Sequence, residues 1–156
     1  MGFYEDLARE RVSSLSLRDA IALDEHTIAR AAVALMRSNG LGCAVIVDQH
    51  GDPTGVFTEQ SVIRLLAEVA CLDTTPVSKF TDPDFFVVRS DDSIQKVWNA
   101  VVRDGARFVC VTDKAGRLMG LTGQRGLSEY VADCFAKQIT VQRLGSAPWM
   151  LQREGA

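Results

Sequence analysis

The stretch GLGCAVIVDQHGDPTGVFTEQSV (residues 40–62) decides the fold, because a related stretch, GARFVCVTDKAGRLMGLTGQRGL, recurs at residues 105–127. In each copy an apolar run ends at an aspartate, a glycine-containing turn follows, and a second apolar run leads into a third segment. This order predicts two strands joined by a hairpin turn. A shift of 65 residues superimposes Gly40, Asp48, Gly51 and Gly55 on Gly105, Asp113, Gly116 and Gly120.

Helical patterns flank both predicted hairpins. Residues 24–40 and 89–105 each begin with capping residues and end near a glycine, and short apolar segments precede them at 20–23 and 85–88. After each hairpin, apolar residues recur at the spacing of a helix with one buried face. These residues are Val62, Leu65, Leu66, Val69 and Ala70 in the first copy, and Leu127, Tyr130, Val131, Cys134 and Phe135 in the second.

The helix predicted within residues 24–40 is apolar on nearly every side, so its buried face has two solutions. One solution buries Ala29, Ala32, Val33 and Met36, which match the second copy at the same shift. The other buries Ile28, Ala31, Ala32, Leu35 and Met36. The pattern alone leaves both open.

The predicted fold is α/β (α+β), built from two β-α-β-β-α repeats. A single unit of this kind leaves one sheet face uncovered, so the two copies are expected to pack sheet to sheet with pseudo-twofold symmetry. The predicted divisions are an N-terminal helical extension (1–12), a first repeat (13–72), a second repeat (73–135) and an irregular C-terminal tail (136–156). Trp149 is expected to anchor that tail on the body.

Composition excludes several classes of function. The chain has 156 residues, a net charge of −3 and a pI near 5.4, so nucleic acid and anionic membranes are not expected partners. No export, lipidation or membrane-spanning pattern is visible, which predicts a cytoplasmic protein. The four cysteines are expected to be reduced core thiols, and no metal site is predicted. No set of nucleophile, base and orienting acid is present, so an enzyme is not expected.

The two copies resemble a tandem pair of cystathionine β-synthase (CBS) domains, the Bateman module, of the stand-alone bacterial type. The resemblance covers roughly residues 13–135 and rests on residues 39–66 and 104–131, which match the family's order of glycine, apolar strand, aspartate, turn, Gly-apolar-apolar-Thr and helix, with Gly123 in place of the Thr in the second copy. It implies a homodimer that binds an adenine nucleotide between the repeats and regulates another, unidentified protein. AMP, ADP and ATP are the implied ligands, with S-adenosylmethionine and NAD as secondary candidates.

The resemblance also implies particular ligand contacts. In the family, a Thr or Ser followed three residues later by Asp opens the last helix, and the Asp holds the ribose hydroxyls. Here Thr58 and Ser61 occupy these positions in the first repeat, and Gly123 and Gly126 occupy them in the second. A family Thr in the opening strand is matched by Ala22 and Val87.

Other implied contacts come from the backbone and from basic side chains. The segments that resemble the family's adenine-edge segment begin after each upstream glycine, and Arg107 and Arg125 are candidate phosphate ligands because a guanidinium fork suits phosphate oxygens. Gly123 and Gly126 would let a bulky ligand approach the chain. The adenine-edge candidates are Leu41, Gly42, Cys43 and Ala44 in the first repeat, and Ala106, Arg107, Phe108 and Val109 in the second.

Alternatives to nucleotide sensing remain open at this point. Thr58 and Ser61 would also serve as a helix N-cap without any ligand. The protein would then be a ligand-free dimerisation or interaction module. The Gly123–Gly126 stretch also has the form of an RNA-clamping G-x-x-G loop, but the acidic balance of the chain counts against that use.

Overall fold

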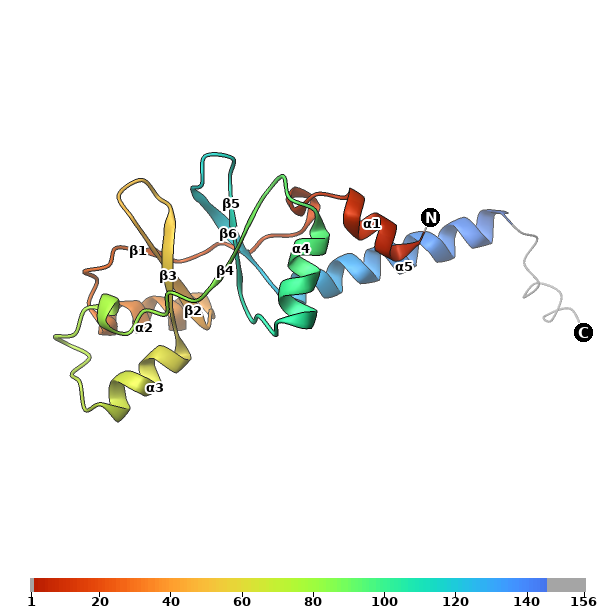
Figure 1. The fold of residues 1–156 in the computed structure, drawn as a ribbon. Coiled ribbons are helices and arrows are strands. Elements are labelled where there is room, and N and C mark those ends of the chain that lie inside the picture. Colours follow the sequence, from red (N-terminus) through yellow and green to blue (C-terminus); the bar gives the residue numbers. More distant parts are fainter. Residues whose placement is uncertain (1, 146–156) are drawn as a thin grey trace, which may run out of the picture.

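The computed structural model describes residues 2–145, with side chains described through residue 137. Two three-stranded sheets lie side by side, each flanked by helices (Figure 1). The first repeat contains β1 (Ala22–Leu23), α2 (Ala29–Asn39), β2 (Cys43–Val47), β3 (Pro53–Thr58) and α3 (Glu59–Ala67). The second contains β4 (Phe86–Arg89), α4 (Ile94–Trp98), a π-helical turn (Asn99–Arg103), β5 (Val109–Thr112), β6 (Leu118–Thr122) and α5 (Gln124–Gly145). A short helix, α1 (Phe3–Arg9), precedes both repeats.

The predicted order of strands and helices is confirmed in both repeats. In each sheet the first strand runs parallel to the second, and the second forms an antiparallel hairpin with the third. The repeated aspartates build the hairpin turns. The Asp48 carboxylate accepts hydrogen bonds from the amides of His50 (2.8 Å) and Asp52 (3.0 Å), and Asp113 accepts the equivalent bonds from Ala115 and Arg117 at the same distances.

The two sheets pack against each other through a small apolar core. This core contains Cys43, Val45, Val56, Cys110 and Leu121, which come from both sheets, so the predicted sheet-to-sheet packing is confirmed. Burial raises the pKa of the Cys43 and Cys110 thiols to about 12, so both remain protonated at neutral pH. Cys71 is exposed, and the expectation that all four cysteines lie in the core is wrong for this residue.

The segment before each repeat packs on the other repeat. Val12 and Leu15 lie in the core of the second repeat, while Val77 and Phe80 lie in the core of the first. The exchange is symmetric, because the Val12 amide donates to the carbonyl of Asp92 (2.9 Å) as the Val77 amide donates to the carbonyl of Thr27 (2.8 Å). We call residues 12–18 and 77–84 the crossing segments. Each repeat therefore completes its core with residues that precede its partner in the sequence.

The repeated glycines at 55 and 120 make this crossing possible. A Cβ atom on Gly120 would lie 2.8 Å from the carbonyl oxygen of Arg18, and a Cβ on Gly55 would lie 3.0 Å from that of Asp82. At the same points the crossing segments pair with the third strands, through Arg18 with Leu121 and Asp82 with Val56. The recurrence of glycine at this position thus follows from backbone packed against backbone.

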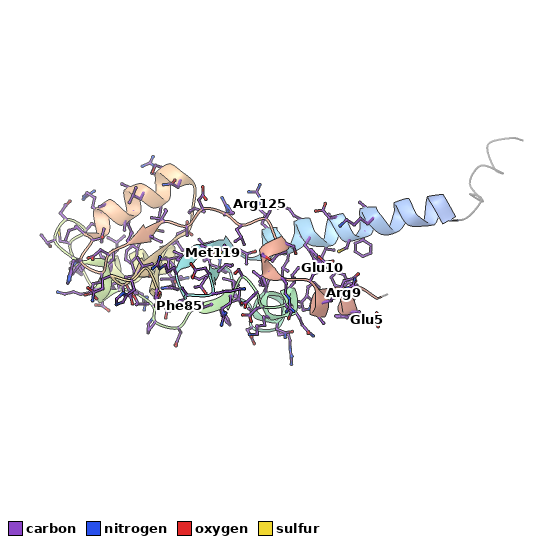
Figure 2. All side chains as sticks on the ribbon, turned by 90° about the horizontal axis from the view of Figure 1, so that it is seen from above. Glu5, Arg9, Glu10, Phe85, Met119 and Arg125 are labelled. Atoms are coloured by element: carbon purple, nitrogen blue, oxygen red, sulfur yellow. The ribbon has the colours of Figure 1, made fainter. Side chains whose placement is uncertain are left out.

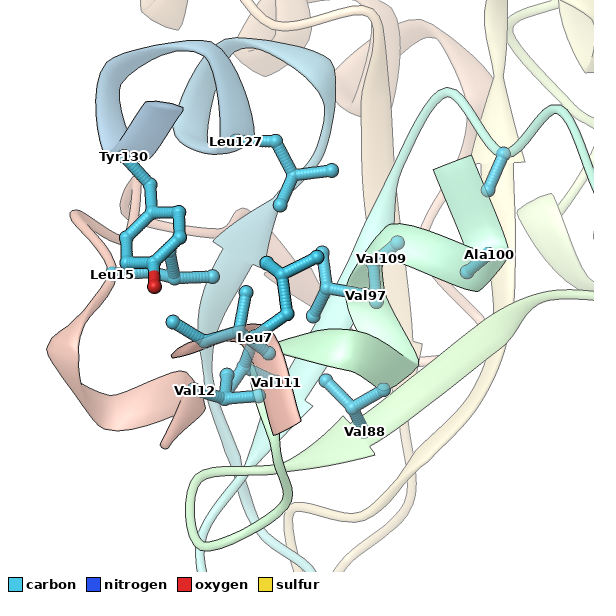
Figure 3. Packing of buried hydrophobic residues seen from close by; sticks show 12 residues of the cluster. Leu7, Val12, Leu15, Val88, Val97, Ala100, Val109, Val111, Leu127 and Tyr130 are labelled. Carbon is cyan, nitrogen blue, oxygen red and sulfur yellow. The ribbon is translucent and has the colours of Figure 1, made fainter. Parts of the chain in front are cut away.

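The N-terminal helix is part of the second repeat's core. Leu7 of α1 is fully buried and packs among Val12, Val97 and Val111 (Figure 3). At the other end of the chain, α5 continues to Gly145 and extends away from the body (Figure 1). The prediction of an irregular tail is wrong for residues 136–145, which contain neither glycine nor proline before Gly145. The predicted anchor Trp149 lies outside the described residues.

The structure settles the buried face of α2. Ala29, Ala32 and Met36 are buried while Leu35 is 41% exposed, so the solution that matches the second repeat is confirmed. The stripes predicted for the last helix of each repeat are only partly buried. Leu65, Leu127 and Tyr130 are in the core, but Leu66 and Phe135 are each 56% exposed. Val69 lies beyond the end of α3 and is 90% exposed.

Candidate functional site

Two clefts lie at equivalent places between the repeats, each at the N-terminus of a repeat's last helix. Cleft 1 lies at the start of α3 and is bounded by the crossing segment that includes Asp82. Cleft 2 lies at the start of α5 and is bounded by the crossing segment that includes Arg18. Their volumes are about 220 Å³ and 670 Å³. Only cleft 2 falls within the size range of pockets that hold small-molecule ligands, about 300–1,000 Å³.

The helix that opens onto cleft 1 is capped by its own side chains. The Ser61 amide donates to Thr58 Oγ1 (3.3 Å) and the Thr58 amide donates to Ser61 Oγ (3.0 Å), which forms a capping box. The Glu59 amide donates to the carbonyl of Gly42 (3.2 Å). Thr58 and Ser61 therefore have a structural role, and Ser61 is fully buried in it.

We expect Ser61→Ala to destabilise the fold because it removes half of this capping box. The expected loss is about 1 kcal/mol, in the range of measured N-cap losses, which lowers the midpoint of thermal unfolding by about 3 °C. Ser38→Ala is the matched control, since the Ser38 hydroxyl is exposed, donates to the carbonyl of Leu35 and accepts from Asn39 Nδ2, and caps no helix N-terminus. Equal midpoints for the two variants would contradict a capping role for Ser61.

The helix that opens onto cleft 2 has no such cap. Gly123 precedes α5 and has no side chain, and the first bond from the turn joins the Leu127 amide to the Gly123 carbonyl (3.1 Å). The amides of residues 124–126 precede the first bond of the helix, and within the described part of the chain no side chain caps them. Gln124, Arg125 and Gly126 all line cleft 2.

The two clefts also differ in charge. Cleft 2 is lined by Arg18, Arg107 and Arg125 with one carboxylate, Glu129. Arg125 Nε lies 3.3 Å from Glu129 Oε1, and the Arg125 side chain is 73% exposed. Figure 2 shows Arg125 at the end of α5 that meets the body of the protein. Cleft 1 is lined by three carboxylates and Arg107, and the carboxylates belong to Glu59, Asp82 and Asp84.

One residue of cleft 2 carries a polar group without a partner. Thr122 is 6% exposed, and within the described part of the chain its hydroxyl oxygen makes no hydrogen bond. The hydroxyl lies directly beneath the first turn of α5, because a Cβ on Gly126 would be 2.5 Å from Thr122 Oγ1. A buried, unsatisfied hydroxyl is costly by about 1–3 kcal/mol, and such groups in native proteins commonly mark a functional contact.

Sequence reasoning missed Arg18 and Thr122. The 65-residue shift contained a signal for the second, since it pairs Thr122 with Phe57, a fully buried core residue. A hydroxyl in place of a core aromatic residue is unusual. No sequence pattern indicated Arg18, because local patterns do not predict the exchange of crossing segments that brings this residue to the second repeat.

The structure divides the predicted site residues into three groups. Those that line cleft 2 are Leu41, Arg107, Phe108, Gly123, Arg125 and Gly126. Those that line cleft 1 are Gly42, Thr58 and Ala106, together with the shared Arg107 and Phe108. Those that line neither cleft are Cys43, Ala44 and Val109, which are fully buried, the buried cap residue Ser61, and Ala22 and Val87, which are exposed on β1 and β4.

Comparison with known families decides the classification. The profile described as CBS domain matches residues 12–68 and 77–133. The chain belongs to the CBS domain family. It is a tandem CBS domain pair, and proteins built from such pairs are typically regulatory and non-catalytic.

Curated relatives of this CBS pair are archaeal. An uncharacterized 17.7 kDa protein of Acidianus ambivalens is 27% identical over 112 residues, which cover 72% of this chain and 66% of the relative. Uncharacterized proteins of Methanocaldococcus jannaschii and Methanopyrus kandleri are 26% and 25% identical. The chain spans 66%, 32% and 57% of the lengths of these three relatives.

Solved CBS structures share the fold of this chain. The CBS domain protein PAE2072 from Pyrobaculum aerophilum, complexed with AMP, is 26% identical with a TM-score of 0.67 and covers 76% of this chain and 90% of its own. The CBS domain pair of protein MJ0100, in complex with 5-methylthioadenosine and S-adenosyl-L-methionine, has the same TM-score at 16% identity, covering 80% and 97%. At that identity the likeness concerns the fold alone.

Neither a membrane-spanning helix nor a metal-binding cluster is found among the residues that the structure describes. No helix among them is both long and apolar enough to cross a membrane. No group of three or more His, Cys, Asp or Glu side chains within residues 2–137 is arranged to hold a metal ion.

Proposed function

We propose that this CBS pair is a cytoplasmic regulatory module that binds an adenine nucleotide in cleft 2. The observation that carries the proposal is the uncapped N-terminus of α5, which opens into a cleft of about 670 Å³ lined by three arginines. A helix N-terminus with free amides favours anions, and guanidinium groups bind phosphate oxygens. The similarity to a CBS protein complexed with AMP supports the adenine nucleotide as the ligand class.

Cleft 1 is a poor candidate for the same ligand. Its volume of about 220 Å³ is too small for a nucleotide, and Glu59, Asp82 and Asp84 would repel phosphate. At the start of α3 the amides of Thr58, Glu59 and Ser61 are already bonded to Ser61 Oγ, the Gly42 carbonyl and Thr58 Oγ1. We therefore propose one nucleotide for each chain.

The adenine ring would occupy the apolar side of cleft 2. Leu41 and Phe108 line that side and belong to the two segments predicted to meet the adenine edge. Because Leu41 comes from the first repeat and α5 from the second, a nucleotide in cleft 2 would contact both repeats. Binding would then favour the packing arrangement of the two repeats in which Leu41 and the start of α5 both contact the nucleotide. A partner protein would respond to this change in packing.

The proposed module is a homodimer. The helical faces carry apolar side chains that the chain itself does not cover, including Leu66, Val102 and Phe135, each 56% exposed. These exposed residues also favour the second candidate function, a dimerisation or interaction module that works without a ligand. Such side chains are available for a contact with a second chain, in which they would be buried.

Calorimetric titration with AMP, ADP and ATP tests nucleotide binding, and thermal unfolding gives a second measurement. Ligand at 100 times its dissociation constant adds about 2.7 kcal/mol of stability, which raises the unfolding midpoint by about 5–10 °C. Arg125→Ala should weaken binding about tenfold through the loss of one phosphate contact. Arg103→Ala, an exposed arginine that lines neither cleft, should leave the affinity unchanged. If no adenosyl ligand binds at millimolar concentration, the proposal fails and the ligand-free dimerisation module is favoured.

A further inference from the structure

We propose that cleft 2 recognises the phosphate of its ligand and does not recognise the ribose 2′-hydroxyl. The inference rests on the proposed nucleotide site and concerns its specificity. It predicts that a nucleoside monophosphate and its 2′-deoxy form bind alike, whereas the nucleoside without phosphate binds much more weakly.

The first argument is that the start of α5 has no room for a ribose-binding carboxylate. Gly126 occupies the position of such a carboxylate, and a Cβ there would lie 2.5 Å from Thr122 Oγ1. Gly123 is equally confined, because its Cβ would lie 2.7 Å from the carbonyl oxygen of Arg107. Packing therefore favours glycine at both positions, because a side chain at 123 would displace the backbone of Arg107 and one at 126 would displace the side chain of Thr122.

The second argument concerns the single carboxylate that lines cleft 2. Glu129 lies six residues, about 1.7 turns, further along the chain than Gly123, and its Oε1 accepts from Arg125 Nε at 3.3 Å. Its negative charge is thus offset by an arginine of the same cleft. With Arg18 and Arg107 also present, the cleft retains a positive balance that favours a phosphate group.

Within the described part of the chain, unsatisfied backbone amides and an unsatisfied side-chain hydroxyl lie together at the start of α5. The first-turn amides of α5, a helix of 22 residues, face the cleft, and the Thr122 hydroxyl under the same turn has no partner among the residues that the structure describes. In the first repeat the equivalent amides of Glu59 and Ser61 donate to the Gly42 carbonyl and to Thr58 Oγ1, and Phe57 takes the place of Thr122. Donors left without acceptors at a helix N-terminus bind an anion with several oxygens, and a phosphate monoester is such a group.

The test is a calorimetric titration of the full chain with AMP, 2′-deoxy-AMP and adenosine. We expect the dissociation constants of AMP and 2′-deoxy-AMP to agree within about threefold, and that of adenosine to be at least about 30-fold higher, as for the loss of two charge-assisted hydrogen bonds. A tenfold or greater loss with 2′-deoxy-AMP, or equal binding of adenosine, would overturn the inference while leaving the nucleotide site intact. If AMP itself does not bind, the proposed function fails first.

Thr122→Val provides a second measurement that separates a ligand contact from a structural role. Valine keeps the shape of threonine and removes the hydroxyl, so the protein without ligand should be at least as stable as the wild type. We expect the affinity for AMP to fall several-fold and that for adenosine to stay unchanged. An unchanged affinity for AMP would remove Thr122 from the phosphate site, and a parallel loss for both ligands would show a structural effect only.

Discussion

Replacing Leu7 by alanine should lower the free energy of unfolding by about 2–5 kcal/mol, the range measured for buried leucines. Although Leu7 lies in the segment that the sequence presents as an extension, it is fully buried in the second repeat's core, beside Val12, Val97 and Val111 (Figure 3). Truncation there leaves a cavity that this small core cannot refill. The midpoint of thermal unfolding should fall by roughly 5–15 °C.

The matched control for this variant is Leu35→Ala, which makes the same chemical change on α2 at a side chain that is 41% exposed. Surface substitutions of this kind usually change stability by less than about 0.5 kcal/mol. Urea or thermal unfolding followed by circular dichroism measures both variants. If Leu7→Ala were no more destabilising than Leu35→Ala, α1 would not belong to the folded core.

The second large effect is expected at Gly126, where alanine should destabilise the protein by about 1–3 kcal/mol, as overpacked sites do. Helix propensity predicts the opposite sign, because alanine within a helix is more favourable than glycine by about 1 kcal/mol. The reason for the reversal is the 2.5 Å distance between the new Cβ and Thr122 Oγ1. Chemical unfolding of the single variant decides between the two signs.

A double variant tests the cause of that effect. Thr122→Ala removes the atom that the new methyl group would meet, so the two substitutions together should cost less than the sum of their separate effects. Thr122→Val keeps a methyl group in nearly the same place and should give no such relief. Additive effects in both pairs would show that the contact between residues 122 and 126 does not set the stability of this turn.

Much of the fold could be predicted because the repeat carries its own evidence. The shift that aligns Gly55 with Gly120 and Asp48 with Asp113 predicted the strand order, the hairpins and the sheet-to-sheet packing. In the structure the glycines allow close backbone contacts and the aspartates accept hydrogen bonds in the hairpin turns. Turns and close backbone contacts require particular residue types at fixed positions, so they can be recognised in a short stretch of sequence. The same comparison identified the correct face of α2 as one of two solutions.

The exchange of crossing segments could not be predicted in the same way. Val12 and Val77 are ordinary apolar residues, and no short pattern tells which repeat they will enter. The candidate site was predicted only in part for this reason. Arg125 and the glycines follow from the aligned helix starts, but Arg18 reaches cleft 2 through the exchange, and Thr122 matters because of what surrounds it.

The exchange of crossing segments also determines when the core of the second repeat can form during synthesis on the ribosome. Leu7, Val12 and Leu15 leave the ribosome early, but their partners on β5 and α5, such as Val109, Val111 and Leu127, are made about 100 residues later. At synthesis rates of about 5–20 residues per second, that interval is roughly 5–20 s. During this time Leu7, Val12 and Leu15 have no completed core to pack into. The first repeat therefore leaves the ribosome before the core of the second repeat can form.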